Sequence, residues 1–278
     1  MITIQNLTFR YKKQEALFTD LSFQQGNGSI VGLLGKNGAG KSTLLQLISG
    51  LLRPQMGELN SNGFKPFDRL PDFLVDIYMV SEEFSFPPIT IGVYIKATAA
   101  LYPKFDYEKM NHILHEFELD AKKNLNQLSH GQRKKFLIAF ALSTNSSLLI
   151  LDEPTNGLDI PSKSLFRKIL VSSVTEEQLV LISTHQVKDI ETVIDTIVVL
   201  DQGKIVYNET IFDISKQWQF KTVASLSGME TPVYQEKCLG GHRIIVPTNS
   251  IEESEIDIEL LFNAIIHKVT LKSEKHAV

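Results

Sequence analysis

The alternation of apolar and polar residues along this chain predicts an α/β fold. Residues 2–10 and 21–25 alternate with the period of strands that are buried on one face. Continuous apolar runs of strand length recur at residues 30–34, 76–80, 148–151, 179–182 and 197–200. Such runs are typical of parallel strands covered on both faces, so we expect a mainly parallel central sheet.

Apolar residues at helical spacing predict helices between these strands. After residue 40 they form one buried face: Leu44, Leu45, Ile48, Leu51 and Leu52. Residues 53–62 contain proline, glycine and asparagine and predict a turn-rich connector. Segments 91–100 and 107–119 return to helical spacing and predict a helical insertion, which we bound at about residues 84–142.

The pattern changes after residue 207. Strand-like segments at 220–226 and 242–246, followed by a helical segment at 256–267, predict a small α+β appendage. We therefore divide the chain into a domain of residues 1–207 and a C-terminal appendage of residues 208–278.

Composition and charge narrow the possible functions. The formal net charge of −4 gives no basic field for nucleic acid, and we expect the short basic run Arg133–Lys135 to be a solvated helix face. The single cysteine, Cys238, excludes an internal disulfide and fits a reducing cytoplasm. The N-terminus does not have the pattern of a secretory signal, and the apolar window 136–151 is too short to cross a bilayer. We expect no nucleic-acid partner, membrane span or covalent membrane anchor.

The stretch Gly35–Ser42 has the pattern of a phosphate-binding loop and lies between a predicted strand and a predicted helix. Its glycines are expected to adopt positive φ and to turn successive amides toward one phosphate. The cation of Lys41 would contact the β- and γ-phosphates, and the hydroxyl of Ser42 would ligate Mg²⁺. A glycine-rich surface turn is the less favoured alternative. The expected ligand contacts of the loop are Gly35, Lys36, Asn37, Gly38, Ala39, Gly40, Lys41, Ser42 and Thr43.

Further polar groups stand where predicted strands end. Asp152 and Glu153 follow the run 148–151, and His185 follows the run 179–182. The carboxyl ends of parallel strands meet at one sheet edge, so we expect these side chains near the glycine loop. Asp152 would orient Mg²⁺, Glu153 would act as a general base or position water, and His185 would polarise the γ-phosphate or the water. Two solvated carboxylates and a structural histidine are the alternatives.

Two other residues have a functional and a structural interpretation. Ser129, in Leu-Ser-His-Gly-Gln, is placed to cap a helix and could leave a second anion site there. A cap without a ligand is the alternative. Tyr11, at the end of the first strand, could stack on a flat base or be a half-buried strand residue.

The order of these motifs resembles that of the nucleotide-binding subunits of ABC transporters. Phosphate loop, Leu-Ser-His-Gly-Gln, Asp-Glu-Pro, Asn-Gly-Leu-Asp and Ser-Thr-His follow one another within about residues 1–207. The resemblance implies a P-loop NTPase of ABC type with a mainly parallel central sheet, an N-terminal antiparallel β subdomain and a helical insertion. It also implies an ATPase that binds ATP and Mg²⁺, forms a homodimer or heterodimer around two nucleotides, and drives a separate multi-span membrane permease.

The resemblance assigns roles to matching positions. Tyr11 would stack on adenine, Glu153 would be the catalytic glutamate and His185 the switch histidine. Asp159 would communicate across the dimer. The residues that would cap the ATP of the other subunit are Ser129, Gly131 and Gln132.

Two positions depart from the family pattern. His130 replaces the first glycine of the usual Leu-Ser-Gly-Gly-Gln, although Ser129 and Gly131 remain and capping should persist. Glu82 stands where a glutamine is expected. A carboxylate can ligate Mg²⁺ but cannot donate an amide hydrogen bond, so Glu82 would serve the metal but not the hydrogen bond that a glutamine amide donates.

The short insertion and its Tyr102–Asp106 segment are similar to the ATPases of small bacterial exporters of the bacitracin-resistance type. This similarity favours export, with a chain that is cytoplasmic and peripheral at the inner face of the cell membrane. The alternatives are a soluble ABC-type ATPase without a permease and, because of His130 and Glu82, an idle nucleotide sensor. A small GTPase is disfavoured, since no Asn-Lys-x-Asp segment follows the loop.

Overall fold

A six-stranded sheet is the centre of the computed structural model, which describes residues 1–226, 231–248, 254–269 and 271. Its strand order is β5-β6-β7-β3-β8-β9, and its pairs are parallel except β8 with β9. The strands are β3 (Ser29–Leu34), β5 (Ile77–Val80), β6 (Leu148–Asp152), β7 (Leu179–Thr184), β8 (Thr196–Asp201) and β9 (Lys204–Thr210). The predicted mainly parallel sheet is confirmed.

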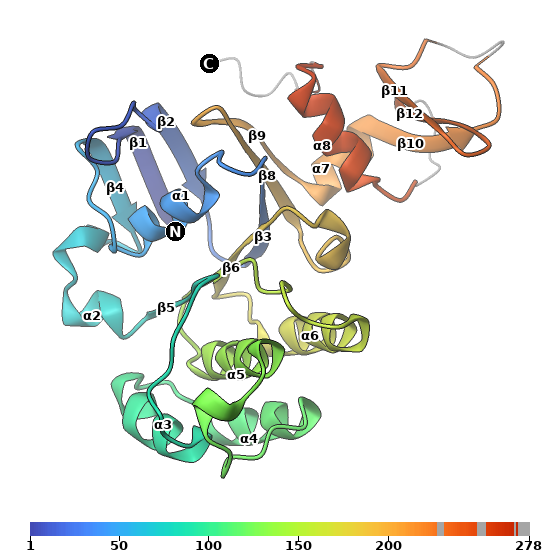
Figure 1. Cartoon of the computed structure of the whole chain (residues 1–278). Helices are drawn as coiled ribbons and strands as arrows, with labels where there is room; N and C mark the ends of the chain where they lie inside the picture. Colours follow the sequence, from blue (N-terminus) through green and yellow to red (C-terminus); the bar gives the residue numbers. More distant parts are fainter. Residues whose placement is uncertain (227–230, 249–253, 270, 272–278) are drawn as a thin grey trace.

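A separate antiparallel sheet with the order β2-β1-β4 lies on the side of α1 (Lys41–Ile48), as Figure 1 shows. Its strands are β1 (Ile2–Phe9), β2 (Phe18–Gln25) and β4 (Met56–Ser61). Apolar residues of this sheet, of α1 and of one face of the central sheet form a common core, which includes Phe18, Leu44 and Val31. The antiparallel β subdomain is therefore present.

Two predictions in this region are wrong. The connector expected at residues 53–62 contains strand β4, because Met56–Ser61 pairs with β1 through main-chain hydrogen bonds that local composition does not reveal. The helix after the glycine loop ends at Ile48, and Gly50 follows with φ 75°. Leu51 is consequently 52% exposed rather than part of a buried helical face.

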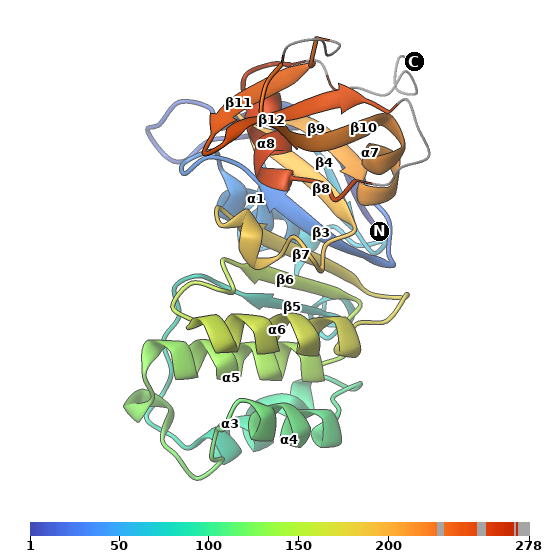
Figure 2. The same cartoon turned by 90° about the vertical axis from the view of Figure 1, so that its right-hand side faces the viewer.

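Helices cover the other face of the central sheet. In Figure 2, α5 (His130–Ser143) and α6 (Ile160–Ser173) lie directly against β5 and β6, with α3 (Ile91–Thr98) and α4 (Tyr107–Glu116) beyond them. Neighbouring strand residues face the two sides, since Leu33 packs in the first core and Leu34 in the second. The predicted helical insertion is confirmed, whereas α6 and the short helix α2 (Pro71–Leu74) were not predicted from the spacing of apolar residues.

The basic run on α5 is not the solvated face that was expected. Lys134 is 0% exposed, and its flexible stem runs inward toward the sheet edge. Burial lowers the pKa of Lys134, while Glu82, Asp152 and Glu153 oppose that shift.

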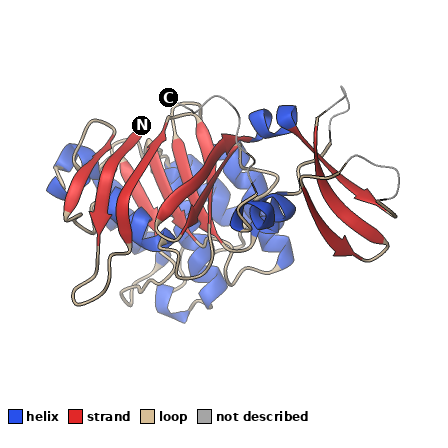
Figure 3. Ribbon diagram, turned by 90° about the horizontal axis from the view of Figure 1, so that it is seen from above, coloured by secondary structure: helices blue, strands red, loops and turns tan. Residues whose placement is uncertain are grey.

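The C-terminal part forms a second three-stranded sheet with the order β10-β12-β11, which projects to one side in Figure 3. Its elements are α7 (Ile211–Gln217), β10 (Trp218–Val223), β11 (Tyr234–Cys238), β12 (Gly241–Pro247) and α8 (Ile258–Ile266). Helix α8 packs beside η4 (Val187–Asp189), where Lys188 Nζ lies 3.5 Å from Glu259 Oε2. Within the described part of the chain, every helix is too short or too polar to span a membrane.

Candidate functional site

The glycine loop joins the end of β3 to the start of α1. Gly38 and Gly40 have φ angles of 80° and 103°, a region that side chains disfavour. Gly35 does not take the positive φ that was expected. It is a glycine because of close packing, since a Cβ atom there would lie 2.5 Å from the carbonyl oxygen of Leu200.

Lys41 holds its cation inside this loop. Its Nζ donates to the carbonyl oxygen of Gly35 at 2.8 Å and lies 3.4 Å from that of Lys36. Burial lowers the pKa of Lys41, although Glu153, Asp152 and Glu82 act in the opposite direction. The ammonium group of Lys41 is therefore bound by neutral carbonyl oxygens of the loop. Charged phosphate oxygens could replace them and would form stronger hydrogen bonds.

Asp152 and Glu153 follow one another at the end of β6, next to Ser183 of β7. The hydroxyl of Ser183 donates to Asp152 Oδ1, and the amide of Glu153 donates to the Ser183 carbonyl oxygen at 3.1 Å. Both carboxylates are buried, at 3% and 5% exposure. Glu153 has φ 46°, a conformation that costs a residue with a side chain about 1–3 kcal/mol and that is concentrated at functional sites.

Glu153 and His185 form a hydrogen-bonded pair. His185 Nδ1 lies 2.8 Å from Glu153 Oε1, and the side chain of His185 is 39% exposed. Glu153 Oε2 is buried without a hydrogen-bond partner among the described residues. One carboxylate oxygen is thus fixed by the imidazole, and the other is a free acceptor.

A cavity of about 760 Å³ brings most of the predicted site residues together. The predicted residues in its wall are Tyr11, Asn37, Gly38, Gly40, Lys41, Ser42, Thr43, Glu82, Glu153 and His185. The hydroxyl of Tyr11 lies 2.9 Å from Thr43 Oγ1, which ties the first strand's end to α1. The segment Gln14–Leu17, with two polar and two apolar residues, also lines the cavity, and the sequence patterns did not predict that.

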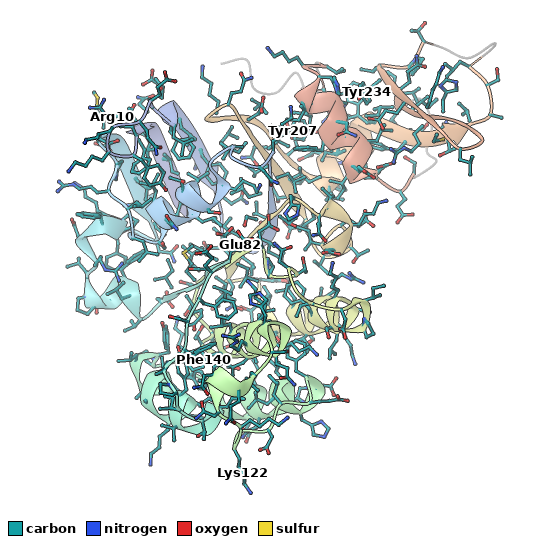
Figure 4. The ribbon with its side chains drawn as sticks, in the orientation of Figure 1. Arg10, Glu82, Lys122, Phe140, Tyr207 and Tyr234 are labelled. Carbon is teal, nitrogen blue, oxygen red and sulfur yellow. The ribbon has the colours of Figure 1, made fainter. Side chains whose placement is uncertain are left out.

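Glu82 lies at the junction of the sheet and the helical part, as Figure 4 shows. Its Oε1 accepts a hydrogen bond from Asn156 Nδ2 at 3.1 Å, and Asn156 Oδ1 lies 3.4 Å from Gln186 Nε2. This chain of contacts connects three segments that each follow a strand. The sequence could not predict it, because the side chains are far apart along the chain.

The Leu-Ser-His-Gly-Gln motif lies apart from this cavity, at the start of α5. Ser129 Oγ accepts from the amide of Gln132 at 3.2 Å, and Gln132 Oε1 accepts from the amide of Ser129 at 3.1 Å. This reciprocal capping box confirms Ser129 as a helix cap. Gly131 packs tightly, since a Cβ there would lie 2.7 Å from the carbonyl oxygen of Gly157. Asp159 caps α6 by accepting from the amide of Ser162 at 3.0 Å.

The donor set of the cavity fits a magnesium-bound triphosphate. The loop amides and Lys41 suit phosphate oxygens, and the Ser42 hydroxyl in the cavity wall is a hard oxygen ligand of the kind that Mg²⁺ takes. The Asp152 carboxylate is a second such ligand; it does not line the cavity itself but ends β6 directly before Glu153, which does. The free Oε2 of Glu153 adds an acceptor for a water proton. The geometry thus has the parts needed to transfer a phosphoryl group to water.

Comparison with known proteins agrees with this chemistry. Residues 18–156 match the family described as "ABC transporter". The SkfA peptide export ATP-binding protein SkfE of Bacillus subtilis is 30% identical over 233 residues, which cover 81% of this chain and 97% of that protein. The zinc uptake system ATP-binding protein ZurA of Listeria monocytogenes is 32% identical over 216 residues, covering 73% of this chain and 83% of that protein.

Solved structures share the fold. A dimeric ATP-binding cassette in a post-hydrolysis state, bound to ADP and Pi, matches with a TM-score of 0.67 and 25% identity. The match covers 76% of this chain and 99% of that one. Motif order, cavity geometry and relatives agree, and the chain therefore belongs to the ABC transporter family as an ATP-binding subunit that hydrolyses ATP with Mg²⁺.

Proposed function

We propose that this chain pairs with a second ATPase subunit around two ATP molecules and drives a separate multi-span permease in the direction of export. The observation that carries the catalytic part of the proposal is the 2.8 Å contact of His185 with Glu153 inside the glycine-loop cavity. The peptide-export relative supports export, and the zinc-uptake relative makes uptake the alternative. The subunit would act at the inner face of the cell membrane.

Glu153 and Lys41 have the central roles in the proposed hydrolysis. Glu153 Oε2 accepts a proton from the attacking water while His185 holds Oε1 in place. Lys41 exchanges its loop carbonyls for phosphate oxygens. Mg²⁺, when bound, neutralises charge on the β- and γ-phosphates, and Ser42, Asp152 and Glu82 would hold it.

The remaining site residues act in nucleotide binding and between subunits. Tyr11, in the cavity wall, stacks on adenine. Ser129, Gly131 and Gln132 cap the ATP of the partner, and Asp159 lies at the contact of the two subunits. Residues 1–207 form the ATP-binding domain, with helical residues 84–142 inside it, and residues 208–278 form the appendage.

Steady-state ATP hydrolysis tests the catalytic assignment. We expect Glu153→Gln to lower kcat by roughly 10²- to 10⁴-fold and to leave ATP binding intact, because a general base is lost. Glu15→Gln is the matched control, since Glu15 is a carboxylate in the wall of the same cavity. Unchanged turnover in Glu153→Gln would refute the mechanism and favour an idle nucleotide sensor.

Copurification tests the permease assignment. The native protein, extracted gently from its cells, should bring a multi-span membrane subunit with it. Recovery of the ATPase free of any membrane subunit would favour a soluble ABC-type ATPase.

A further inference from the structure

Phe84, two residues after Glu82, contacts two side chains of helix α5. The centroid of its ring lies 5.3 Å from that of the His130 imidazole, and the two planes are 22° apart. Lys134 Nζ lies 5.2 Å from the centroid of the same ring. These are the distances of aromatic stacking and of a cation–π contact.

Lys134 places a buried cation against the main chain of this segment. Its Nζ lies 3.4 Å from the carbonyl oxygen of Ser81 and 3.5 Å from that of Glu82. A cation without solvent exposure is costly unless negative charge compensates it. Glu82, Asp152 and Glu153 supply that charge, and the same carboxylates act on Lys41. Lys134 of α5 therefore binds the main chain at Glu82, and the carboxylates of the site balance its charge.

His130 also contacts the main chain at Gly157, next to the residue that binds Glu82. A Cβ atom at Gly157 would lie 2.7 Å from His130 Cδ2, so the imidazole packs directly on the main chain there. The preceding residue, Asn156, donates to Glu82 Oε1. One imidazole thus contacts both the ring that follows Glu82 and the segment that binds the carboxylate of Glu82.

We propose that His130 and Phe84 are positioning residues that hold Glu82 at the Mg²⁺ side of the nucleotide cavity. The inference rests on the proposed function, in which Glu82 is a metal ligand. It explains the two departures from the family pattern together. A glycine at position 130 would have no ring to stack on Phe84. A carboxylate at position 82 lies close to two other carboxylates, so it needs a nearby cation and a fixed backbone.

Binding of Mn²⁺, used as a probe for Mg²⁺, tests this inference without turnover. Electron paramagnetic resonance would measure the Mn²⁺ Kd of the full chain saturated with a non-hydrolysable ATP analogue. Phe84→Leu and His130→Ala should each raise that Kd by roughly two- to tenfold, the value of one aromatic contact. Phe105→Leu, in another ring contact of the helical part, and His112→Ala, on the exposed side of α4, should leave it unchanged.

A double-mutant cycle identifies the path of the effect. Glu82→Ala alone should raise the Mn²⁺ Kd. Adding Phe84→Leu to it should raise the Kd no further, because Phe84 acts on the metal only by positioning the Glu82 carboxylate. Equal effects of Phe84→Leu in both backgrounds, no effect of Glu82→Ala, or equal effects of the control variants would each overturn the inference. His130→Ala, at an exposed position, gives the same cycle if Phe84→Leu does not fold. Failure of the proposed mechanism would appear separately, as unchanged ATP turnover in Glu153→Gln, because that measurement does not involve Phe84 or His130.

Discussion

Ser183 binds the carboxylate of Asp152 and the main-chain amide of Glu153, so Ser183→Ala should weaken the fold measurably. Its hydroxyl donates to Asp152 Oδ1 and lies 3.2 Å from the amide of Glu153, and the residue is 0% exposed. Removing a hydrogen bond to a charged group costs about 1.5–3 kcal/mol, and here a carboxylate that is 3% exposed loses its donor. We expect the free energy of unfolding to fall by about 2–3 kcal/mol.

Urea unfolding followed by far-ultraviolet circular dichroism would measure this change as a lower midpoint with an unchanged slope. Ser143→Ala is the matched control. That serine is also 0% exposed, but its hydroxyl donates to the carbonyl oxygen of Ala139 within one helix, at 2.7 Å. Alanine has the better helix propensity, so the control should lose less than about 1 kcal/mol. Equal losses in the two variants would refute the reasoning.

Substitutions at two further positions test the sheet and the nucleotide site. Burial raises the pKa of Asp76, but hydrogen bonds from Ser147 and Lys104 outweigh it and lower the pKa below its ordinary value of 3.8. Asp76→Asn should therefore destabilise the chain by about 1–2 kcal/mol at neutral pH, and urea midpoints should show this difference fading as the pH falls through the lowered pKa of the folded state. Tyr11→Ala should weaken ATP binding by roughly 5- to 100-fold in calorimetry, whereas Tyr11→Phe, which keeps the ring, should have a much smaller effect. A flat pH profile for Asp76→Asn, or equal losses in the two Tyr11 variants, would contradict these assignments.

The parts of the site that lie within single motifs could be predicted from the sequence. The glycine loop has its sequence pattern together with a strand before it and a helix after it. Ser129 caps α5, and Gln132, three residues later, completes the capping box. The strand ends at Asp152 and Thr184 followed from apolar runs of strand length. Local pattern was sufficient in each case.

The missed features depend on contacts between distant segments. Strand β4 contains Gly57 with φ 87° and forms because β1 supplies its hydrogen bonds. Lys134 belongs to a basic run that would be a solvated face on an isolated helix, and only the fold brings it to the carboxylates of the site. The pairing of Glu82 with Asn156 likewise joins residues 74 positions apart. Tertiary structure overrides local preference at each of these places.

The formation of a dimer by the Glu153→Gln variant tests the central claim most directly. Sedimentation velocity would compare this variant without nucleotide, with ATP and Mg²⁺, and with an added Ser129→Arg substitution that places bulk and charge at the cap. We predict a monomer without nucleotide, a dimer with ATP, and a monomer again when Ser129 is replaced. A variant that binds ATP yet sediments as a monomer at saturating nucleotide would contradict the account.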